Sequence, residues 1–258
     1  MQFIMNSPQE YLEFLEEKYP LSEFLLSQNK TDIPGIYQNI HLEVRLDPAL
    51  PFLFVINGTT GAGKDAITNY LIENKTVFKA ITAVNRDSRL EEPENNYIWM
   101  RKKSADESDS DYLHSLIEEY DLIEFDLHHQ NIYGLPKSSL TNAAQQGPVI
   151  VRNEPKGAKT LFEKLQGQFN IIILFVIPDS WQQIFERIHR NGQERDNVIT
   201  RLEDSSKMLL LSEETTHFYI HSTTNPKQYN QQIQYSGIEF TQKNALALIT
   251  EIQDLSGN

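Results

Sequence analysis

A glycine-rich segment that directly follows a continuous apolar run limits most strongly how this chain folds. The run is Phe52–Asn57, made of β-forming residues, and it leads into Gly58-Thr59-Thr60-Gly61-Ala62-Gly63-Lys64. Asp65–Glu73 then has the composition of a helix. The order of strand, glycine-rich loop and helix is the context in which G-x-x-x-x-G-K forms a phosphate-binding loop. We therefore predict that this loop binds the phosphates of a nucleotide.

The residue types of the loop suit that role. Glycines allow backbone N–H groups to approach phosphate oxygens, and the start of a helix adds partial positive charge. Lys64 supplies a point charge for the outer phosphates. The next position normally carries Ser or Thr, whose hydroxyl binds Mg²⁺, but here it is Asp65. Two interpretations stay open: Asp65 is a ligand of Mg²⁺, or it only caps the helix.

The apolar pattern of the remaining chain predicts the α/β class. Val149–Asn153, Ile171–Ile177 and His217–Ser222 have the composition of further strands. Runs that are apolar on both faces suit a parallel sheet covered by helices. Helical stretches alternate with them: Lys159–Gln166, Ser180–Arg190, Val198–Glu213 and Thr241–Leu255. We expect three layers with a parallel central sheet.

The chain divides into an extension and a larger domain. Residues 1–50 are predicted to form an N-terminal helical extension, because Ser7, Pro8 and Glu10 have the spacing of a helix start. Its apolar stripe is expected to pack on the domain or to bind a protein partner or a second copy. Residues 51–258 are predicted to form the phosphate-loop domain. About residues 82–140, with short mixed segments, are predicted to form an insertion on the main sheet.

Composition excludes several classes of function. The absence of cysteine excludes disulfides, a thiol nucleophile and Cys-based zinc sites. With 36 acidic residues against 23 Lys and Arg, the net charge of −13 argues against nucleic-acid binding. The longest apolar run, Ile171–Ile177, is too short to span a membrane, and the first residues do not resemble a signal peptide. We expect a cytoplasmic protein that does not bind membranes.

Further motifs follow the loop in an order that resembles the guanylate kinase family, from about Phe52 to Leu255. Residues 82–92 are similar to the family's S-x-T-T-R-x-x-R-x-G-E and keep Arg86 and Arg89. Residues 122–124 and 131–134 resemble its F-L-E and N-Y-Y-G with the same separation. Residues 152–157 resemble its D-x-D-x-Q-G. The resemblance implies a phosphate-loop fold with an inserted monophosphate-binding subdomain and a helical lid at about residues 187–202.

The resemblance also implies an activity, namely transfer of the γ-phosphoryl group of ATP, with Mg²⁺, to a nucleoside monophosphate, GMP first of all. Glu124 would accept hydrogen bonds from guanine. Lys64, Arg86, Arg187 and Arg201 would stabilise the charge of the transferred group. The acceptor side is implied to include Thr82, Arg86, Arg89, Tyr97, Glu124, Tyr133 and Glu154.

The chain departs from the family at positions that matter for chemistry. Leu135 replaces a Ser or Thr that helps to recognise guanine, and Arg152 replaces one of two acids. Two alternatives therefore stay open: a kinase of the same architecture with a different phosphorylated acceptor, and a non-catalytic protein-interaction module. The intact Gly58, Gly63 and Lys64 favour an enzyme. From residue patterns alone, Glu124 would lie on the solvated face of a strand.

Overall fold

The computed structural model describes residues 7–88, 96–128, 131–190 and 195–256. The described helices are α1 (Pro8–Lys18), α2 (Leu21–Leu26), α3 (Lys64–Glu73), α4 (Asp109–Glu119), α5 (Lys137–Ala144), α6 (Pro155–Leu165), α7 (Trp181–Arg190), α8 (Arg195–Thr215) and α9 (Gly237–Leu255). The described strands are β1 (Asn29–Lys30), β2 (Ile36–Gln38), β3 (Phe52–Gly58), β4 (Phe78–Lys79), β5 (Ala83–Val84), β6 (Ile98–Trp99), β7 (Leu122–His128), β8 (Asn131–Pro136), β9 (Val149–Arg152), β10 (Asn170–Pro178) and β11 (Phe218–Ser222).

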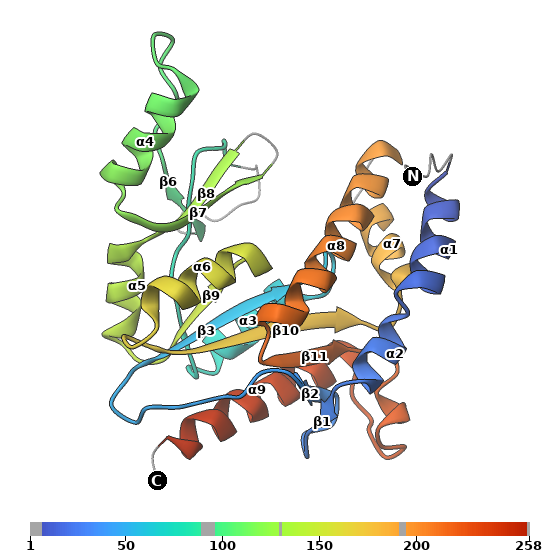
Figure 1. Ribbon diagram of the computed structural model, residues 1–258. Coiled ribbons are helices and arrows are strands. Elements are labelled where there is room, and N and C mark those ends of the chain that lie inside the picture. Colours follow the sequence, from blue (N-terminus) through green and yellow to red (C-terminus); the bar gives the residue numbers. More distant parts are fainter. Residues whose placement is uncertain (1–6, 89–95, 129–130, 191–194, 257–258) are drawn as a thin grey trace.

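The central sheet is mostly parallel, as the sequence predicts. Within the described residues its strand order is β1-β2-β11-β10-β3-β9-β4. Neighbouring strands from β11 to β4 pair in parallel, whereas β2 pairs antiparallel with β11. Helices cover the sheet, and the insertion and the helices α7 and α8 rise at opposite sides of the upper part of Figure 1. The α/β class is therefore confirmed.

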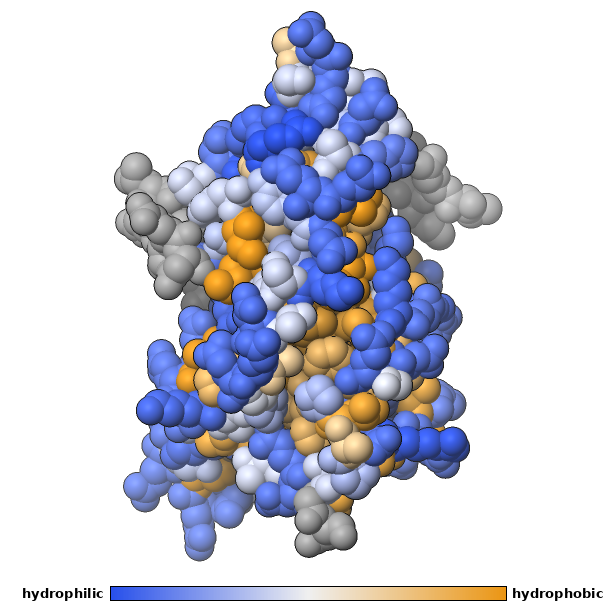
Figure 2. Space-filling view, turned by 90° about the vertical axis from the view of Figure 1, so that its left-hand side faces the viewer, coloured by the Kyte–Doolittle hydropathy of each residue, from blue (hydrophilic) through white to orange (hydrophobic). Residues whose placement is uncertain are grey.

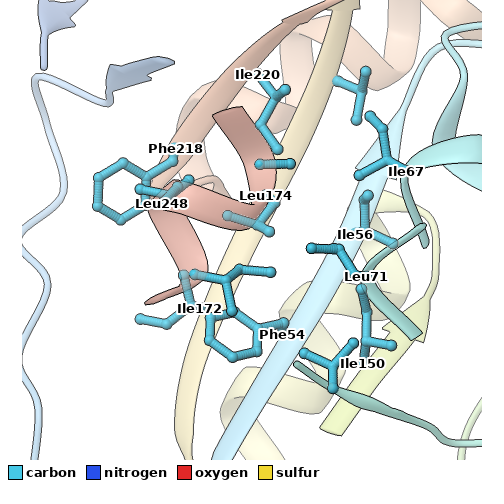
Figure 3. Close-up of a cluster of buried hydrophobic side chains, with 14 of the residues drawn as sticks. Phe54, Ile56, Ile67, Leu71, Ile150, Ile172, Leu174, Phe218, Ile220 and Leu248 are labelled. Atoms are coloured by element: carbon cyan, nitrogen blue, oxygen red, sulfur yellow. The ribbon is translucent and has the colours of Figure 1, made fainter. Parts of the chain in front are cut away.

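Alternating side chains of the buried strand β3 fill two cores on the two faces of the sheet. Phe54 and Ile56 pack with side chains of α3 and α9, as Figure 3 shows for Ile67, Leu71 and Leu248. The intervening Leu53 and Val55 pack on the other face with side chains that include those of α6. Each fully buried aliphatic or aromatic side chain stabilises the fold by roughly 1.5–3 kcal/mol. A strand that is apolar at every position therefore has to lie between two helical layers.

The insertion contains its own small sheet, with the described strand order β6-β5-β8-β7. Its core is formed by side chains that include Met100 and Leu116 of α4. The helix α4 begins in an acidic stretch, with Ser108 as the N-cap and Asp109 and Asp111 in the first turn. Figure 2 shows that hydrophilic residues dominate the upper end of this face, where Figure 1 places α4.

The N-terminal segment is helical only in its first half, which corrects the prediction of a helical extension over residues 1–50. The helix α1 begins as predicted, because Ser7 Oγ accepts a hydrogen bond from the backbone N–H of Glu10. Beyond α2, however, β1 and β2 lengthen the central sheet. Strands of two or three residues leave little apolar pattern, and the pairing of β2 with β11 depends on tertiary contact.

Not one of the described helices combines the length and the apolar character that crossing a bilayer requires.

Candidate active site

The phosphate loop connects the carboxyl end of β3 to the first turn of α3. Gly58 has φ of 145° and Gly63, the N-cap of α3, has φ of 97°. A Cβ atom at Gly58 would lie 2.6 Å from the carbonyl oxygen of Val176, so a larger residue there would displace the neighbouring strand. In parallel sheets, ligands bind beyond the carboxyl ends of the strands. The loop occupies that place.

The side chain of Lys64 folds back onto the start of the loop. Its Nζ donates hydrogen bonds to the carbonyl oxygens of Gly58 and Thr59, each at 2.8 Å. Burial lowers the pKa of the ammonium group to about 8, while the carboxylates of Asp65 and Glu154 oppose that shift. The protonated amine is thus held at the loop by groups that a phosphate can replace.

The helices α7 and α8, which hold most of the predicted lid, contact the loop directly. Arg187 Nη1 of α7 donates to the carbonyl oxygen of Gly61 at 2.6 Å. Ser205 Oγ of α8 accepts a hydrogen bond from the backbone N–H of Thr60 at 3.2 Å. These contacts join the loop to both helices. Residues 191–194 between them lie outside the described residues.

Two pockets flank the loop, and Lys64 and Asp65 line both of them. We call the first the insertion-side pocket; its described lining is Lys64, Asp65, Thr82, Tyr97, Glu124, Asp126, Tyr133, Gly134, Leu135, Val151, Arg152, Asn153 and Glu154. We call the second the lid-side pocket; its described lining is Gly61, Ala62, Gly63, Lys64, Asp65, Ala66, Arg187 and Ile238.

Glu124 is buried at the wall of the insertion-side pocket and is only 5% exposed. Its carboxylate accepts a hydrogen bond from Asn153 Nδ2 at 2.9 Å. Burial, together with the nearby Asp126 and Glu154, raises the pKa of Glu124 to about 7 against the hydrogen bond from Asn153. Gly157 allows this close packing, because a Cβ atom there would lie 2.5 Å from Glu124 Oε1.

Aromatic rings surround the guanidinium group of Arg86. Its central carbon lies 5.0 Å from the ring centroid of Tyr97 and 5.5 Å from that of Trp99. Its Nε donates to the hydroxyl of Tyr133 at 3.1 Å. Cation–π contacts and this hydrogen bond orient the guanidinium group. Tyr97 and Tyr133 line the insertion-side pocket, so the cluster gives that pocket a positively charged side.

Asp65 is bound by Arg152, which forms an ion pair with its Oδ1 atom. Asp65 is therefore more than a cap of the helix, because its carboxylate is paired with Arg152. Among the described residues, there is no group of three or more His, Asp or Glu side chains that could hold a metal ion. Mg²⁺ usually takes one or two carboxylates plus phosphate oxygens and water, so the carboxylate of Asp65 fits such a donor set.

The structure brings most of the predicted site residues together. Thr82, Tyr97, Glu124, Tyr133 and Glu154 line one pocket with Lys64 and Asp65. Arg86 reaches that pocket through Tyr133, whereas Arg187 lines the other pocket. Arg201, half-buried in α8, is absent from the described lining of both pockets. Arg89 lies outside the described residues.

Sequence reasoning missed four contributors to the site. Asn153 and Asp126 line the insertion-side pocket, Trp99 contacts Arg86, and Ser205 contacts the loop. The position of Asn153 between Arg152 and Glu154 was a signal that it lies near the site. Nothing in the sequence around Ser205 points to the loop, because that contact joins segments far apart in the chain.

The fold and the loop together define an α/β phosphate-loop protein. The guanylate kinase family model matches residues 52–231. The guanylate kinase of Clostridioides difficile (strain 630) is 30% identical over 153 residues, or 58% of this chain and 69% of that protein. That of Clostridium perfringens (strain 13 / Type A) is 30% identical over 159 residues, or 60% of this chain and 68% of that protein. This chain belongs to the guanylate kinase family.

A solved structure resembles the fold as well. The crystal structure of guanylate kinase from Anaplasma phagocytophilum matches with a TM-score of 0.54 and 17% identity, covering 79% of this chain and 87% of that chain. At this level of identity the likeness concerns the fold alone.

Proposed function

We propose that the protein transfers the γ-phosphoryl group of ATP to a nucleoside monophosphate, with GMP as the preferred acceptor. The observation that carries the proposal is the meeting of two pockets at Lys64 and Asp65. One pocket is formed by the phosphate loop and α7, and the other by the insertion and the end of β9. Such an arrangement would place two phosphorylated ligands with their phosphates facing each other, which is the positioning that phosphoryl transfer requires.

The lid-side pocket suits the donor. Its loop amides and Lys64 would hold the phosphates of ATP, and Arg187 would leave the carbonyl of Gly61 for a phosphate oxygen. A further pocket includes Asp179 and shares Arg187 and Ile238 with the lid-side pocket, and it would take the adenosine. Bound Mg²⁺, held by Asp65 and the donor phosphates, would neutralise part of their charge.

The insertion-side pocket suits a nucleoside monophosphate. Arg86 and Tyr133 would hold its phosphate, with Arg89 as a proposed second cation. Ionised Glu124 would accept hydrogen bonds from the N–H groups of guanine. Leu135, which is 1% exposed and lines this pocket, cannot donate a hydrogen bond to the base. A different phosphorylated acceptor is therefore the second candidate function, because unsatisfied polar edges of a base weaken discrimination.

The chemistry needs no covalent nucleophile from the protein. An oxygen of the acceptor phosphate forms a bond to the γ-phosphorus, and the bond from that phosphorus to the bridging oxygen breaks. The electron pair leaves on ADP. Lys64, Arg86 and the lid arginines Arg187 and Arg201 would stabilise the charge on the transferred group. Closure of the lid would exclude water and so prevent ATP hydrolysis.

A coupled assay of ADP formation across GMP, dGMP, AMP, CMP, UMP and dTMP tests the proposal. We expect the highest kcat/KM with GMP.

Lys64→Ala and Arg86→Ala should each lower turnover by about 100-fold or more, because each variant loses a positive charge that would stabilise the transferred phosphoryl group. Their unfolding curves should stay close to that of the wild type. Near wild-type turnover in either variant would contradict the mechanism, and a preference for another acceptor would favour the second candidate.

A further inference from the structure

The ion pair between Arg152 and Asp65 lies where the two pockets meet. Arg152 is the last residue of β9, and it pairs in register with Ile56 near the end of β3. Asp65 lies in the first turn of α3 and lines both pockets, whereas Arg152 lines the insertion-side pocket. The guanidinium group is therefore close to the place where the last phosphate of a donor meets an acceptor.

The two partners differ in exposure. The side chain of Arg152 is 25% exposed, whereas that of Asp65 is 73% exposed. An ion pair with a well-solvated carboxylate contributes little to stability. A phosphate group carries more charge and accepts two parallel hydrogen bonds from a guanidinium group. A phosphate can therefore displace Asp65 from Arg152.

The balance of charges in the insertion-side pocket indicates why a phosphate would need Arg152. Among its described lining residues, the carboxylates of Asp65, Glu124, Asp126 and Glu154 face the cations Lys64 and Arg152. Without Arg152 the described lining would keep only Lys64 against these four acids. Arg86, which contacts the lining residue Tyr133, would be a further cation nearby. The attraction for phosphate at the boundary of the two pockets would then be weaker. Arg152 also contributes to the lowered pKa of Lys64, so the two positive groups lie close enough to interact. Two cations held together in this way suit a polyphosphate.

We propose that Arg152 is a further catalytic residue that exchanges Asp65 for the terminal phosphate of the donor nucleotide. Its guanidinium group stays on that phosphoryl group while the bond to the bridging oxygen breaks and the bond to the acceptor oxygen forms. It supplies charge and takes part in no proton transfer. The role of Arg152 during transfer to the acceptor rests on the proposed function, whereas its contact with the terminal phosphate of ATP does not.

The competing explanation is that Arg152 only neutralises Asp65. The variants Arg152→Gln, Asp65→Ser and the double variant distinguish the two roles. Lys159→Gln is a matched control, because Lys159 pairs with the exposed Glu214 on the surface. Calorimetry in EDTA gives the affinities for ATP and for ADP, which lacks the terminal phosphate. A coupled assay with Mg²⁺ and GMP gives kcat.

We expect Arg152→Gln to weaken ATP binding by about tenfold or more and to leave ADP binding unchanged. Its kcat should fall by about 100-fold or more. The double variant should behave like Arg152→Gln, and Lys159→Gln like the wild type. Recovery of ATP affinity and turnover in the double variant to the level of Asp65→Ser would overturn the proposal. So would wild-type ATP affinity in Arg152→Gln.

The two proposals fail in different ways. If ATP affinity depends on Arg152 but the wild type transfers phosphate to no monophosphate, the proposed function is wrong and the contact with the donor is supported. If the wild type phosphorylates GMP and the double variant recovers the ATP affinity and turnover of Asp65→Ser, the role proposed for Arg152 is wrong and the proposed function stands.

Discussion

Glu124 illustrates at the residue scale how a side chain proposed to bind a ligand can oppose stability. Its carboxylate is buried and has an amide of Asn153 as a partner, but the acids Asp126 and Glu154 lie near it. Burial and these two acids raise its pKa to about 7, against the opposing effects of the Asn153 hydrogen bond and of Lys164. In the unfolded chain the same group titrates near its usual value of about 4.5. Folding therefore favours the protonated form, whereas guanine would require the ionised form.

Glu124→Gln should stabilise the free protein above pH 7. The folded state holds the proton of Glu124 up to a pKa of about 7, so the wild type loses stability as the pH rises from about 4.5 towards that value. The gain in the variant should be on the order of 2–3 kcal/mol at pH 8 and should shrink towards pH 5. Urea denaturation across this pH range measures it. Parallel pH profiles for the two proteins would contradict the assignment.

The site could be predicted only in part from single residues. Lys64 and the glycines were found from local spacing, because the loop is one continuous segment. Glu124 was found through the family resemblance, since strand alternation alone predicts a solvated side chain. The partner of Asp65 was not found, because Arg152 lies 87 positions away in the chain and meets it only through the pairing of β3 with β9.

At the scale of elements, the N-terminal helix α1 packs on α7 and α8, which hold most of the predicted lid. Leu12 and Leu15 of α1 share a core with Ile184 of α7 and Leu202 of α8. Figure 1 shows α1 alongside these two helices, and the indole N–H of Trp181 donates to the carbonyl oxygen of Tyr19 at 2.7 Å. The apolar stripe of α1 is therefore covered within the chain. A partner or second copy at this extension stays a prediction and would have to contact another face.

Leu15→Ala should destabilise the protein by about 2–5 kcal/mol, because it opens a cavity between α1 and the lid helices. Leu26→Ala is the matched control in α2: its side chain is 63% exposed, and its effect should stay within about 0.5 kcal/mol. Urea denaturation of both variants measures the difference. Equal effects would mean that α1 is not packed on α7 and α8 in solution.

The elements found from the sequence are those with the longest patterns. The strands β3, β9 and β10 are apolar at nearly every position because both faces are buried, and this signal does not depend on the rest of the fold. The strands β1, β2, β4 and β5 have two or three residues each. Their structure comes from pairing with a neighbour that only the tertiary fold provides, so local propensity does not reveal them.

On the scale of the whole molecule, two pockets share one wall, which contains Lys64 and Asp65. The chain carries a net charge of −13, which repels anions in general. Cations are nevertheless placed beside both pockets, with Lys64 in common, Arg187 on one side and Arg86 and Arg152 on the other. We therefore expect phosphate groups to bind at this boundary in spite of the overall charge. A ligand that crosses the boundary should therefore use both pockets at once.

Calorimetric titration with adenosine and guanosine joined through a 5′,5′-pentaphosphate tests this claim most directly. Because binding of the second half is then intramolecular, we expect one molecule per chain and an affinity at least about 100-fold higher than that of ATP or GMP alone. Lys64→Ala should abolish most of that gain. An affinity no higher than that of ATP, or two molecules bound per chain, would contradict the account.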